Sequence, residues 1–342
     1  MEPLVSILIP AYNAQHWIAD AIKSALAQTW QRKEVVIVDD GSSDETLRVA
    51  SEFAANGVCV VTQPNQGAAA ARNKAFSVCQ GDYIQWLDAD DLLAPDKVEK
   101  QLDEVEKCFS RRTLLSGAWA YFMYRKRKAH FSPTPLWCDL TPTEWMLRKM
   151  GQNLHMQTDN WLVSRELSAA AGPWDARLWR DNDGEYFARV ILASDGVRFI
   201  PEAKSYYRAA GFKSISHIGG SSKKLESLLL SMKLHIRYLR SLEDSERTRA
   251  ACINYIRTWL PEFCPYRLDL VEELKRITSE LGGHSEEPRL SWKYHWIVKC
   301  FGWRLGRRAQ LLMPKLKGSL LIAWDKALSR LENQGATNHC QT

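Results

Sequence analysis

The sequence of 342 residues has little of what marks a secreted or membrane-spanning protein. Its eight cysteines include no CxxC pair and show no spacing typical of a disulfide framework. The chain starts without a signal-type apolar run, and no stretch is long and apolar enough to span a bilayer. We therefore expect a cytoplasmic protein with free thiols, in which the cysteines serve as small core residues.

Charge is distributed unevenly along the chain, although the net charge is only +6. Residues 1–110 contain nine Lys or Arg and seventeen Asp or Glu, whereas residues 289–330 contain ten basic residues and one acid. An acidic region suits a cation site, and a basic tail suits an anionic surface. The two ends of the chain therefore predict two different roles.

The first hundred residues alternate between strand and helix patterns. Short apolar, β-branched runs predict buried strands at residues 4–10, 34–39, 58–62 and 83–87. Helical spacing of apolar residues predicts helices between and after them, at residues 14–28, 45–56, 67–79 and 95–108. This order predicts an α/β fold with a parallel sheet covered on both faces.

The remaining sequence predicts fewer strands and longer helices. Strand patterns cover residues 114–124, 160–163 and 197–207, and helical patterns cover residues 141–150, 165–171, 184–194, 222–242 and 246–260. The composition of residues 282–288 predicts a linker.

Three carboxylates follow the strand predicted at residues 83–87. Asp88, Asp90 and Asp91 stand in the segment WLDADDL, and ligands of parallel sheets bind beyond the carboxyl ends of strands. Packed carboxylates repel one another, and a hard cation such as Mg²⁺ or Mn²⁺ relieves that repulsion. An acidic loop that caps the next helix is the alternative.

Three further motifs lie at the ends of predicted strands. Pro10-Ala-Tyr-Asn13 offers the Tyr12 ring to a base, and Asp39 or Asp40 could accept hydrogen bonds from a base or a ribose. In the segment 65–73, Gly67 permits close backbone approach and Arg72 can pair with a diphosphate. Each motif alone is compatible with a turn, a helix cap or a solvated residue, but together they converge on one sheet edge.

The segments PAYN at 10–13, VDDGSSD at 38–44, NQGAAAARN at 65–73 and LDADD at 87–91 closely resemble the family 2 glycosyltransferases of the GT-A fold. The resemblance is specific over residues 1–110 and looser to about residue 216. It implies a single Rossmann-like, mostly parallel sheet flanked by helices. Residues 1–110 would form the nucleotide-sugar-binding half, residues 111–218 the acceptor-binding half, and residues 219–342 a helical extension.

The resemblance also implies roles for individual residues. A base and ribose would contact Pro10, Ala11, Tyr12, Asp39 and Asp40, and the diphosphate would lie near Gly67 and Arg72. Asp88 would face the ribose, Asp90 would bind the metal, and Asp91 would support the metal or the donor sugar. The implied donor is a nucleotide-diphosphate sugar, with uridine as the usual base.

Family members carry a Glu-Asp pair upstream of an Arg, and the Asp is the general base. Counting back from Arg189 places Asp183 at the base position and Asn182 where Glu is usual. Asp181 and Glu185 are neighbouring alternatives for the base, and all of these acids would also suit the first turn of a helix. Many members carry a metal-proximal His after the last strand; His217 is the candidate substitute in this sequence, and a solvated loop His is the alternative.

These features predict an inverting, metal-assisted glycosyltransferase that acts on a glycan or lipid-linked acceptor. A non-catalytic sugar-nucleotide or glycan-binding protein of the same fold is the alternative, because Asn182 departs from the family pattern. A dehalogenase-type hydrolase also carries DxD after a strand. Its nucleophile lies near the chain start, however, and Asp88 does not.

The tail over residues 289–330 combines its ten basic residues with Trp292, Trp296, Trp303 and Trp324. Basic residues interleaved with tryptophan are typical of helices that lie in a membrane interface. The sequence thus predicts contact with an anionic membrane surface, peripheral at its inner face, and shows no module for nucleic acid. Helices that pack on the catalytic domain are the alternative.

Overall fold

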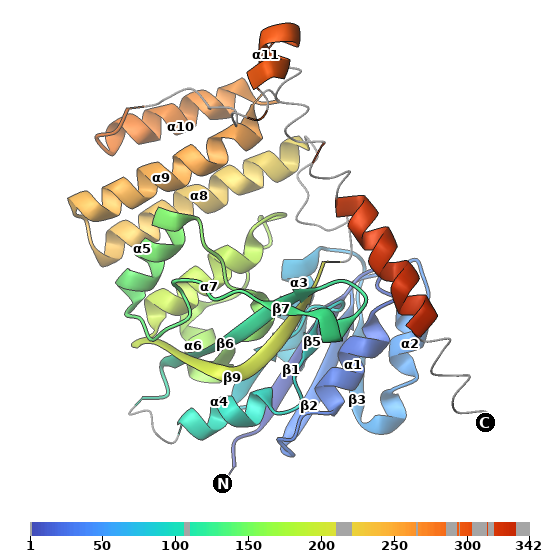
Figure 1. The fold of residues 1–342 in the computed structure, drawn as a ribbon. Coiled ribbons are helices and arrows are strands. Elements are labelled where there is room, and N and C mark those ends of the chain that lie inside the picture. The colour runs from blue at the N-terminus through green and yellow to red at the C-terminus, as the bar shows by residue number, and fades with distance from the viewer. Residues whose placement is uncertain are drawn as a thin grey trace.

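The structure is a computed structural model that describes residues 2–105, 110–209, 221–264, 266–284, 293, 295–302, 313 and 318–332. Figure 1 shows a twisted sheet in the N-terminal part, helices on both of its faces, and a stack of helices built from the C-terminal part. Only residues 282–284 of the predicted linker are described, and of the basic tail the described residues are 293, 295–302, 313 and 318–330.

The described residues form a nine-stranded, mostly parallel sheet in the order β3-β2-β1-β4-β8-β6-β9-β5, with β7 paired to β6. The strands are β1 (Val5–Ala11), β2 (Lys33–Asp39), β3 (Val58–Thr62), β4 (Tyr83–Trp86), β5 (Leu92–Leu93), β6 (Thr113–Phe122), β7 (His130–Phe131), β8 (Leu162–Ser164) and β9 (Gly196–Arg208). The predicted α/β fold is confirmed, and the predicted strands match β1–β4, β6, β8 and β9. The two-residue strands β5 and β7 have no sequence pattern long enough to predict them.

Strand direction brings the predicted motifs to one edge of the sheet. β1 pairs in parallel with both β2 and β4, so the three strands end side by side. β9 is also parallel to β6, and its last residue, Arg208, is paired with Phe122 at the end of β6. Residues that follow β1, β2, β4 and β9 therefore share the carboxyl edge, where parallel sheets bind ligands.

Side chains alternate between two apolar cores, one on each face of the sheet. Leu8 of β1 belongs to one core, and its neighbours Ile7 and Ile9 belong to the other. One face is covered by α1 (Ile18–Leu26), α2 (Thr46–Ser51) and α4 (Lys97–Val105), and the other by α3 (Ala68–Val78), α5 (Pro142–Gln152), α6 (Arg165–Ala171) and α7 (Asn182–Ala193). This alternation is the pattern expected for strands buried on both faces.

The C-terminal helices continue the second core rather than forming a separate one. α8 (Ser222–Leu242), α9 (Glu246–Phe263) and α10 (Leu268–Glu280) stack beside α5 and α7 (Figure 1), and their apolar residues lie in the same cluster as β4 and α7. α10 was not predicted from the sequence. Beyond α11 (His295–Phe301), residues 318–332 form a helix that contacts the segment after β6 through Asp325 and Glu332.

Two sequence expectations, on the burial of the cysteines and on membrane-spanning segments, can be compared with the structure. Cys59 and Cys300 are exposed, so not every cysteine is a core residue, although Cys79 and Cys252 are buried as expected. Within the described ranges, no helix has the length and apolarity needed to cross a membrane.

Candidate active site

The edge where β1 and β2 end carries the first two predicted motifs. Pro10 and Ala11 end β1, and the ring of the following Tyr12 is exposed. Asp39 is buried at the end of β2; its Oδ2 accepts a hydrogen bond from the Ser42 N–H at 3.2 Å, but its Oδ1 has no partner among the described residues. Because a buried acceptor without a donor is costly, Asp39 Oδ1 is suited to a ligand N–H or O–H.

Asp40 is used by the protein itself. Its Oδ1 accepts from the Gln66 N–H at 2.9 Å and from Gln63 Nε2 at 2.7 Å, and its Oδ2 accepts from the Gly67 N–H at 2.8 Å. Gly67 has φ of +92°, a conformation that a side chain would strain. The Asp40 carboxylate thus fixes the loop that leads into α3, and contact between Asp40 and a ribose stays a prediction.

The three carboxylates after β4 have different surroundings. The Asp88 side chain is partly exposed, and its Oδ1 accepts from Arg72 Nη2 at 2.6 Å. Burial, and then the nearby Asp88 carboxylate, raise the pKa of Asp90 to about 6. Asp91 is buried, and burial followed by repulsion from Asp90 raises its pKa well above the usual range. The loop thus brings three carboxylates together, of which Asp88 is paired with Arg72 and the other two have raised pKa values.

Arg208 at the end of β9 holds this acidic loop in place. Its backbone N–H donates to Asp91 Oδ1 at 2.7 Å, and its Nε donates to the backbone oxygen of Asp90 at 2.7 Å. The guanidinium stacks between the rings of Trp17 and Phe122, each with a centroid 4.5 Å away. Because its carboxylate already binds the β9 backbone, Asp91 is placed to support the loop.

A buried Lys–Asp pair beneath the loop escaped the sequence analysis. Asp159 is fully buried, and neither of its carboxylate oxygens has a hydrogen-bond partner among the described residues. Burial raises the pKa of Asp159 and lowers the pKa of Lys97, and each charge partly offsets that shift in the other. Lys97 Nζ donates to Gln85 Oε1 at 2.5 Å and to Gln101 Oε1 at 2.7 Å. No motif surrounds these residues, and only their tertiary position reveals them.

The carboxylates fit a cation that also binds a ligand. Within the described ranges, no three His, Cys, Asp or Glu side chains lie close enough to hold a metal on their own. Mg²⁺ and similar cations, however, often take one or two carboxylates together with waters and substrate phosphates. The raised pKa of Asp90, caused by burial and by Asp88, reflects repulsion that a cation would relieve. His217, the other predicted ligand, lies outside the described residues.

Arg72 joins the two halves of the site. Its guanidinium donates to Asp88 at 2.6 Å and to Asn182 Oδ1 at 3.1 Å, and it lies 4.4 Å from the Trp174 ring centroid. The neighbouring Asn73 exchanges two hydrogen bonds with the Trp174 backbone, at 2.8 and 2.9 Å. The segment 65–73 thus ties the acidic loop to the start of α7.

Asp183 stands in the first turn of α7, next to Asn182. Burial, and then the neighbouring Asp181 carboxylate, raise its pKa, whereas Arg72 opposes that shift. No described side chain hydrogen-bonds the Asp183 carboxylate. It lines a cavity of about 50 Å³ together with Trp145, Lys149 and other residues of α5 and α7. Asp183 is therefore the acid of this turn that remains open to an external group.

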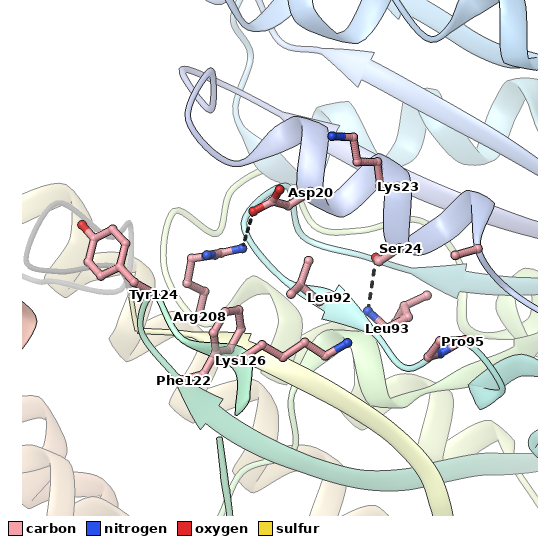
Figure 2. A pocket seen from close by; sticks show the side chains of 11 residues that line it. Asp20, Lys23, Ser24, Leu92, Leu93, Pro95, Phe122, Tyr124, Lys126 and Arg208 are labelled. Atoms are coloured by element: carbon pink, nitrogen blue, oxygen red, sulfur yellow. Dashed lines mark hydrogen bonds and ion pairs between the residues drawn. The ribbon is translucent and has the colours of Figure 1, made fainter. Parts of the chain in front are cut away.

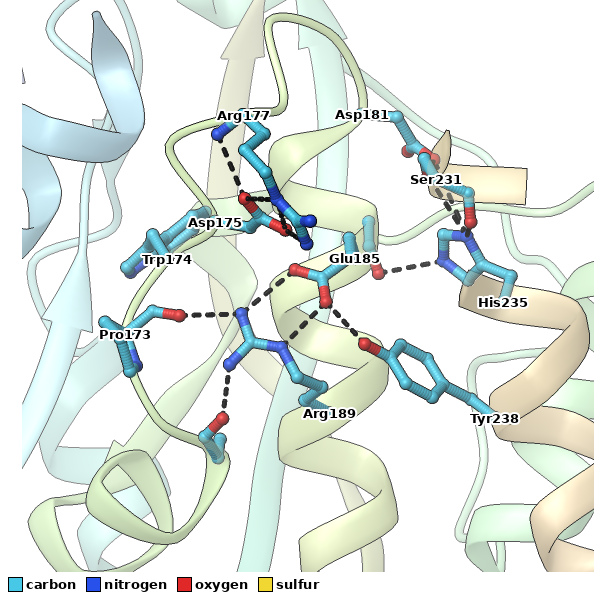
Figure 3. Close-up of polar contacts among 12 residues, drawn as sticks. Pro173, Trp174, Asp175, Arg177, Asp181, Glu185, Arg189, Ser231, His235 and Tyr238 are labelled. Carbon is cyan, nitrogen blue, oxygen red and sulfur yellow. Dashed lines mark hydrogen bonds and ion pairs between the residues drawn. The ribbon is translucent and has the colours of Figure 1, made fainter. Parts of the chain in front are cut away.

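Glu185, one alternative base, is engaged in a buried network. Figure 3 shows its carboxylate between Arg189, at 2.7 and 2.9 Å, and the Tyr238 hydroxyl, at 2.7 Å. Arg189 also donates to the backbone oxygens of Ala171 and Pro173. This network fixes α7 against the preceding loop and against α8, and it leaves Glu185 without a role for a substrate proton.

Asp181, the other alternative, is held by α8. It precedes α7 in a left-handed conformation, with φ of +56°, and its Oδ2 accepts from the Ser231 hydroxyl (Figure 3). His235 lies 3.8 Å from the same oxygen, and its Nε2 contacts the Gly184 backbone oxygen at 3.0 Å. A side chain at Gly184 would clash with the Asp181 carboxylate. The sequence analysis missed this contribution of α8, because its residues read only as an amphipathic helix.

Comparison with known families agrees with this geometry. Residues 6–168 match the family described as "Glycosyl transferase family 2". Among curated proteins, the chain is 50% identical over 110 residues to chondroitin synthase of Escherichia coli, which is 32% of this chain and 16% of that protein. It is 43% identical over 104 residues to an uncharacterized glycosyltransferase of Haemophilus influenzae, which is 30% of this chain and 42% of that protein. The chain thus spans less than half the length of either relative.

Solved structures share the fold at low sequence identity. The crystal structure of S. aureus TarS 1-349 has a TM-score of 0.59 at 16% identity and covers 78% of this chain and 73% of that one. The same protein in complex with UDP-GlcNAc has a TM-score of 0.57 at 15% identity and covers 83% of this chain and 93% of that one. The fold is therefore the GT-A type expected from the sequence.

Proposed function

Because residues 6–168 form a family 2 glycosyltransferase domain, we propose that this chain transfers a sugar from a nucleotide-diphosphate donor to an acceptor hydroxyl, with inversion. One observation carries the proposal: Arg72 binds Asp88 of the acidic loop and Asn182 beside Asp183. The Asp183 carboxylate, which no side chain in the described part of the chain hydrogen-bonds, therefore lies next to the edge where the nucleotide would bind.

The donor would bind along the carboxyl edge of β1, β2 and β4. The exposed Tyr12 ring is available to stack on the base, and Asp39 Oδ1 is available to accept the imide hydrogen of uracil. We infer a uridine nucleotide because a solved neighbour of the same fold binds UDP and UDP-GlcNAc. Asp88 keeps one oxygen for the ribose while the other accepts from Arg72.

Asp90 would hold Mn²⁺ or Mg²⁺ at the donor diphosphate. Such an ion stabilises the negative charge that develops on the departing nucleoside diphosphate. Asp91 and Arg208 keep the loop in position through the contact between the Asp91 carboxylate and the Arg208 N–H. In this arrangement Asp90 would contact the ligand, and Asp91 contacts β9.

Asp183 would act as the general base. The acceptor oxygen attacks the anomeric carbon, a new carbon–oxygen bond forms, and the bond to the diphosphate oxygen breaks. The proton of the acceptor hydroxyl moves to the Asp183 carboxylate, and the nucleoside diphosphate leaves with the bonding electron pair. The raised pKa of Asp183, caused mainly by burial, makes it a better proton acceptor than an exposed aspartate.

A non-catalytic binding protein of the same fold is the second candidate, because Asn182 replaces the usual Glu. The Asn182 amide oxygen accepts from Arg72, so this position still contributes to the link between the two halves. Turnover separates the two functions, since both would bind a donor.

We also propose that residues 318–332 contact an anionic membrane and bring the enzyme to a glycan or lipid-linked acceptor. One side of this helix binds the catalytic domain through Asp325, whose Oδ1 accepts from Arg125 at 2.7 Å. The other side exposes Leu320, Trp324 and Leu331. Exposed apolar residues beside basic ones are typical of helices in a membrane interface.

Release of nucleoside diphosphate from UDP-sugars, with Mn²⁺ and a panel of glycan and lipid-linked acceptors, tests the proposed reaction. We expect the wild-type protein to release UDP in the presence of one acceptor class. The Asp183→Asn variant should bind the UDP-sugar but release no UDP. Donor binding without turnover over the whole panel would favour the binding protein instead.

A further inference from the structure

A second cavity lies on the α1 side of the acidic loop, between α1, β5 and the ends of β6 and β9 (Figure 2). Its volume is about 390 Å³, within the range of small-ligand sites. Apolar side chains line much of it, namely Leu92, Leu93, Pro95 and Phe122. No motif of the sequence analysis points to this cavity, and the proposed reaction does not use it.

The charged residues around this cavity are not balanced. Asp20 is paired with Arg208 at 3.1 Å. Lys23 and Lys126 also line the cavity, but neither ammonium group has a hydrogen bond or ion pair with another described residue. Lys126 lies 4.3 Å from the centroid of the Tyr206 ring, and burial lowers its pKa. The cavity therefore presents two cations without carboxylate partners, which favours an anionic ligand.

The cavity also borders the helix formed by residues 318–332. Tyr124 lines the cavity, and its backbone N–H donates to Asp325 Oδ2 of that helix at 2.9 Å. The next residue, Arg125, binds both Asp325 and Glu332. The apolar face with Trp324 is thus joined to the cavity through a single segment of β6 and its following turn.

We propose that this cavity binds the phosphate headgroup of an anionic phospholipid. Lys23 and Lys126 would contact the phosphate, and Leu93 and Phe122 would contact the glycerol and the first acyl carbons. The inference rests on the membrane association proposed above. It extends that proposal, because a charged surface can attract a membrane without binding any one lipid, whereas this cavity would bind a single headgroup. Arg208 is not part of the inference, since it already binds Asp20 and the Asp90 backbone.

Calorimetric titration of the full chain with dihexanoyl phosphatidylglycerol, below its micelle concentration, tests this site. Dihexanoyl phosphatidylcholine and inorganic phosphate are the comparison ligands. We expect phosphatidylglycerol to bind most tightly, because it is the only one of the three ligands that combines a headgroup of net negative charge with apolar groups. Equal affinity for phosphatidylcholine would overturn the proposal, and equal affinity for inorganic phosphate would show a free-anion site instead.

Three variants separate the cavity from general surface charge. The Lys23→Met/Lys126→Met pair removes the unpaired cations, and Ala27→Trp fills the cavity from its exposed rim without changing charge. The Lys233→Met/Lys275→Met pair removes the same charge from α8 and α10 as a control. We expect about tenfold weaker binding or more in the first two variants, from lost charge-assisted contacts or lost space, and little change in the control.

The outcomes are distinguishable from failure of the proposed function. UDP binding with Mn²⁺ should be unchanged in all three variants, because none of these residues lies at the donor edge. Unchanged phosphatidylglycerol affinity in Ala27→Trp would overturn the headgroup site even if vesicle binding persists. Loss of UDP binding in the wild-type protein would instead contradict the donor site.

Discussion

At the scale of single residues, the acidic side chains of the site form two groups: those whose carboxylate oxygens accept hydrogen bonds from the protein, and those with an oxygen left for a ligand. Asp40, Asp91 and Glu185 accept hydrogen bonds from described residues and fix a loop, a strand end and a helix. Among the described residues, Asp39 retains a buried oxygen without a donor, and no side chain hydrogen-bonds the Asp183 carboxylate. This division explains why adjacent carboxylates in one motif can have opposite roles.

Replacing the acids of α7 one at a time tests this division. Asp183→Asn should lower kcat by roughly 10²–10⁴-fold, the usual contribution of a general base, with donor affinity within a few-fold of the wild type. Glu185→Gln should act mainly on stability, because it weakens the contacts to Arg189 and Tyr238. Steady-state kinetics and thermal unfolding of both variants measure the two effects. Normal kcat in Asp183→Asn together with lost turnover in a fully folded Glu185→Gln would reverse the assignment.

The pH dependence of turnover follows from the same residue. Asp183 must be ionised to accept a proton, and burial and Asp181 raise its pKa. We therefore expect kcat to fall at acidic pH, through a pKa above the ordinary aspartate value. Its contribution to stability should change in the opposite direction: it is present below the unfolded pKa and lost as pH rises through the folded pKa.

Arg72 provides the check on that pH profile. Because the Arg72 charge opposes the raised pKa of Asp183, Arg72→Gln should move the acidic limb of kcat to higher pH. An acidic limb that stays at the same pH in this variant would show that another group controls it.

At the scale of elements, β1–β4 and α1–α4 could be predicted because each has a complete local pattern. Predicted boundaries were less accurate: the helix expected at residues 14–28 begins only at Ile18. The motifs also indicated which strand ends would meet, since parallel strands share an edge. The contacts that position α7 could not be predicted, because Ser231, His235 and Tyr238 come from α8 and no local pattern relates them to Asp183.

The attachment of α7 can be tested by removing Arg189. Arg189→Ala would leave the buried Glu185 carboxylate without its cation and the turn at residues 171–173 without its donor. We expect a loss of about 3–5 kcal/mol in the free energy of unfolding, the usual cost of breaking a buried ion pair on one side. Tyr238→Phe removes a single hydrogen bond and should cost about 1 kcal/mol. Denaturant unfolding compares the two, and equal losses would contradict the central role of Arg189.

At the scale of the whole molecule, the C-terminal extension contributes to two distant places. α8 supports the proposed base, and the helix at residues 318–332 contacts the end of β6 through Arg125. The sequence itself contains a basic tail rich in tryptophan. The attachment of residues 318–332 to the end of β6 could not be predicted, because its ion pairs join residues some 200 positions apart. The division into residues 1–110, 111–218 and 219–342 stays a prediction.

The exposed face of this helix makes a prediction about membranes. Leu320→Ser/Trp324→Ser should reduce co-sedimentation with anionic vesicles, because both side chains are exposed and would enter the interface. UDP binding should not change, since neither residue contacts the donor edge. Binding to vesicles equal to that of the wild-type protein would leave the helix a purely structural element.

The central claim is that Asp90 binds a metal ion together with a nucleotide-diphosphate donor. Calorimetric titration of UDP with and without Mn²⁺, in the wild-type protein and in Asp90→Asn, tests it most directly. Asp90→Asn should not destabilise the metal-free protein, since it removes a charge that Asp88 repels. We predict that Mn²⁺ strengthens UDP binding in the wild-type protein and has little effect in Asp90→Asn. Equal Mn²⁺-dependent binding in the two proteins, or wild-type binding that is indifferent to Mn²⁺, would contradict the account.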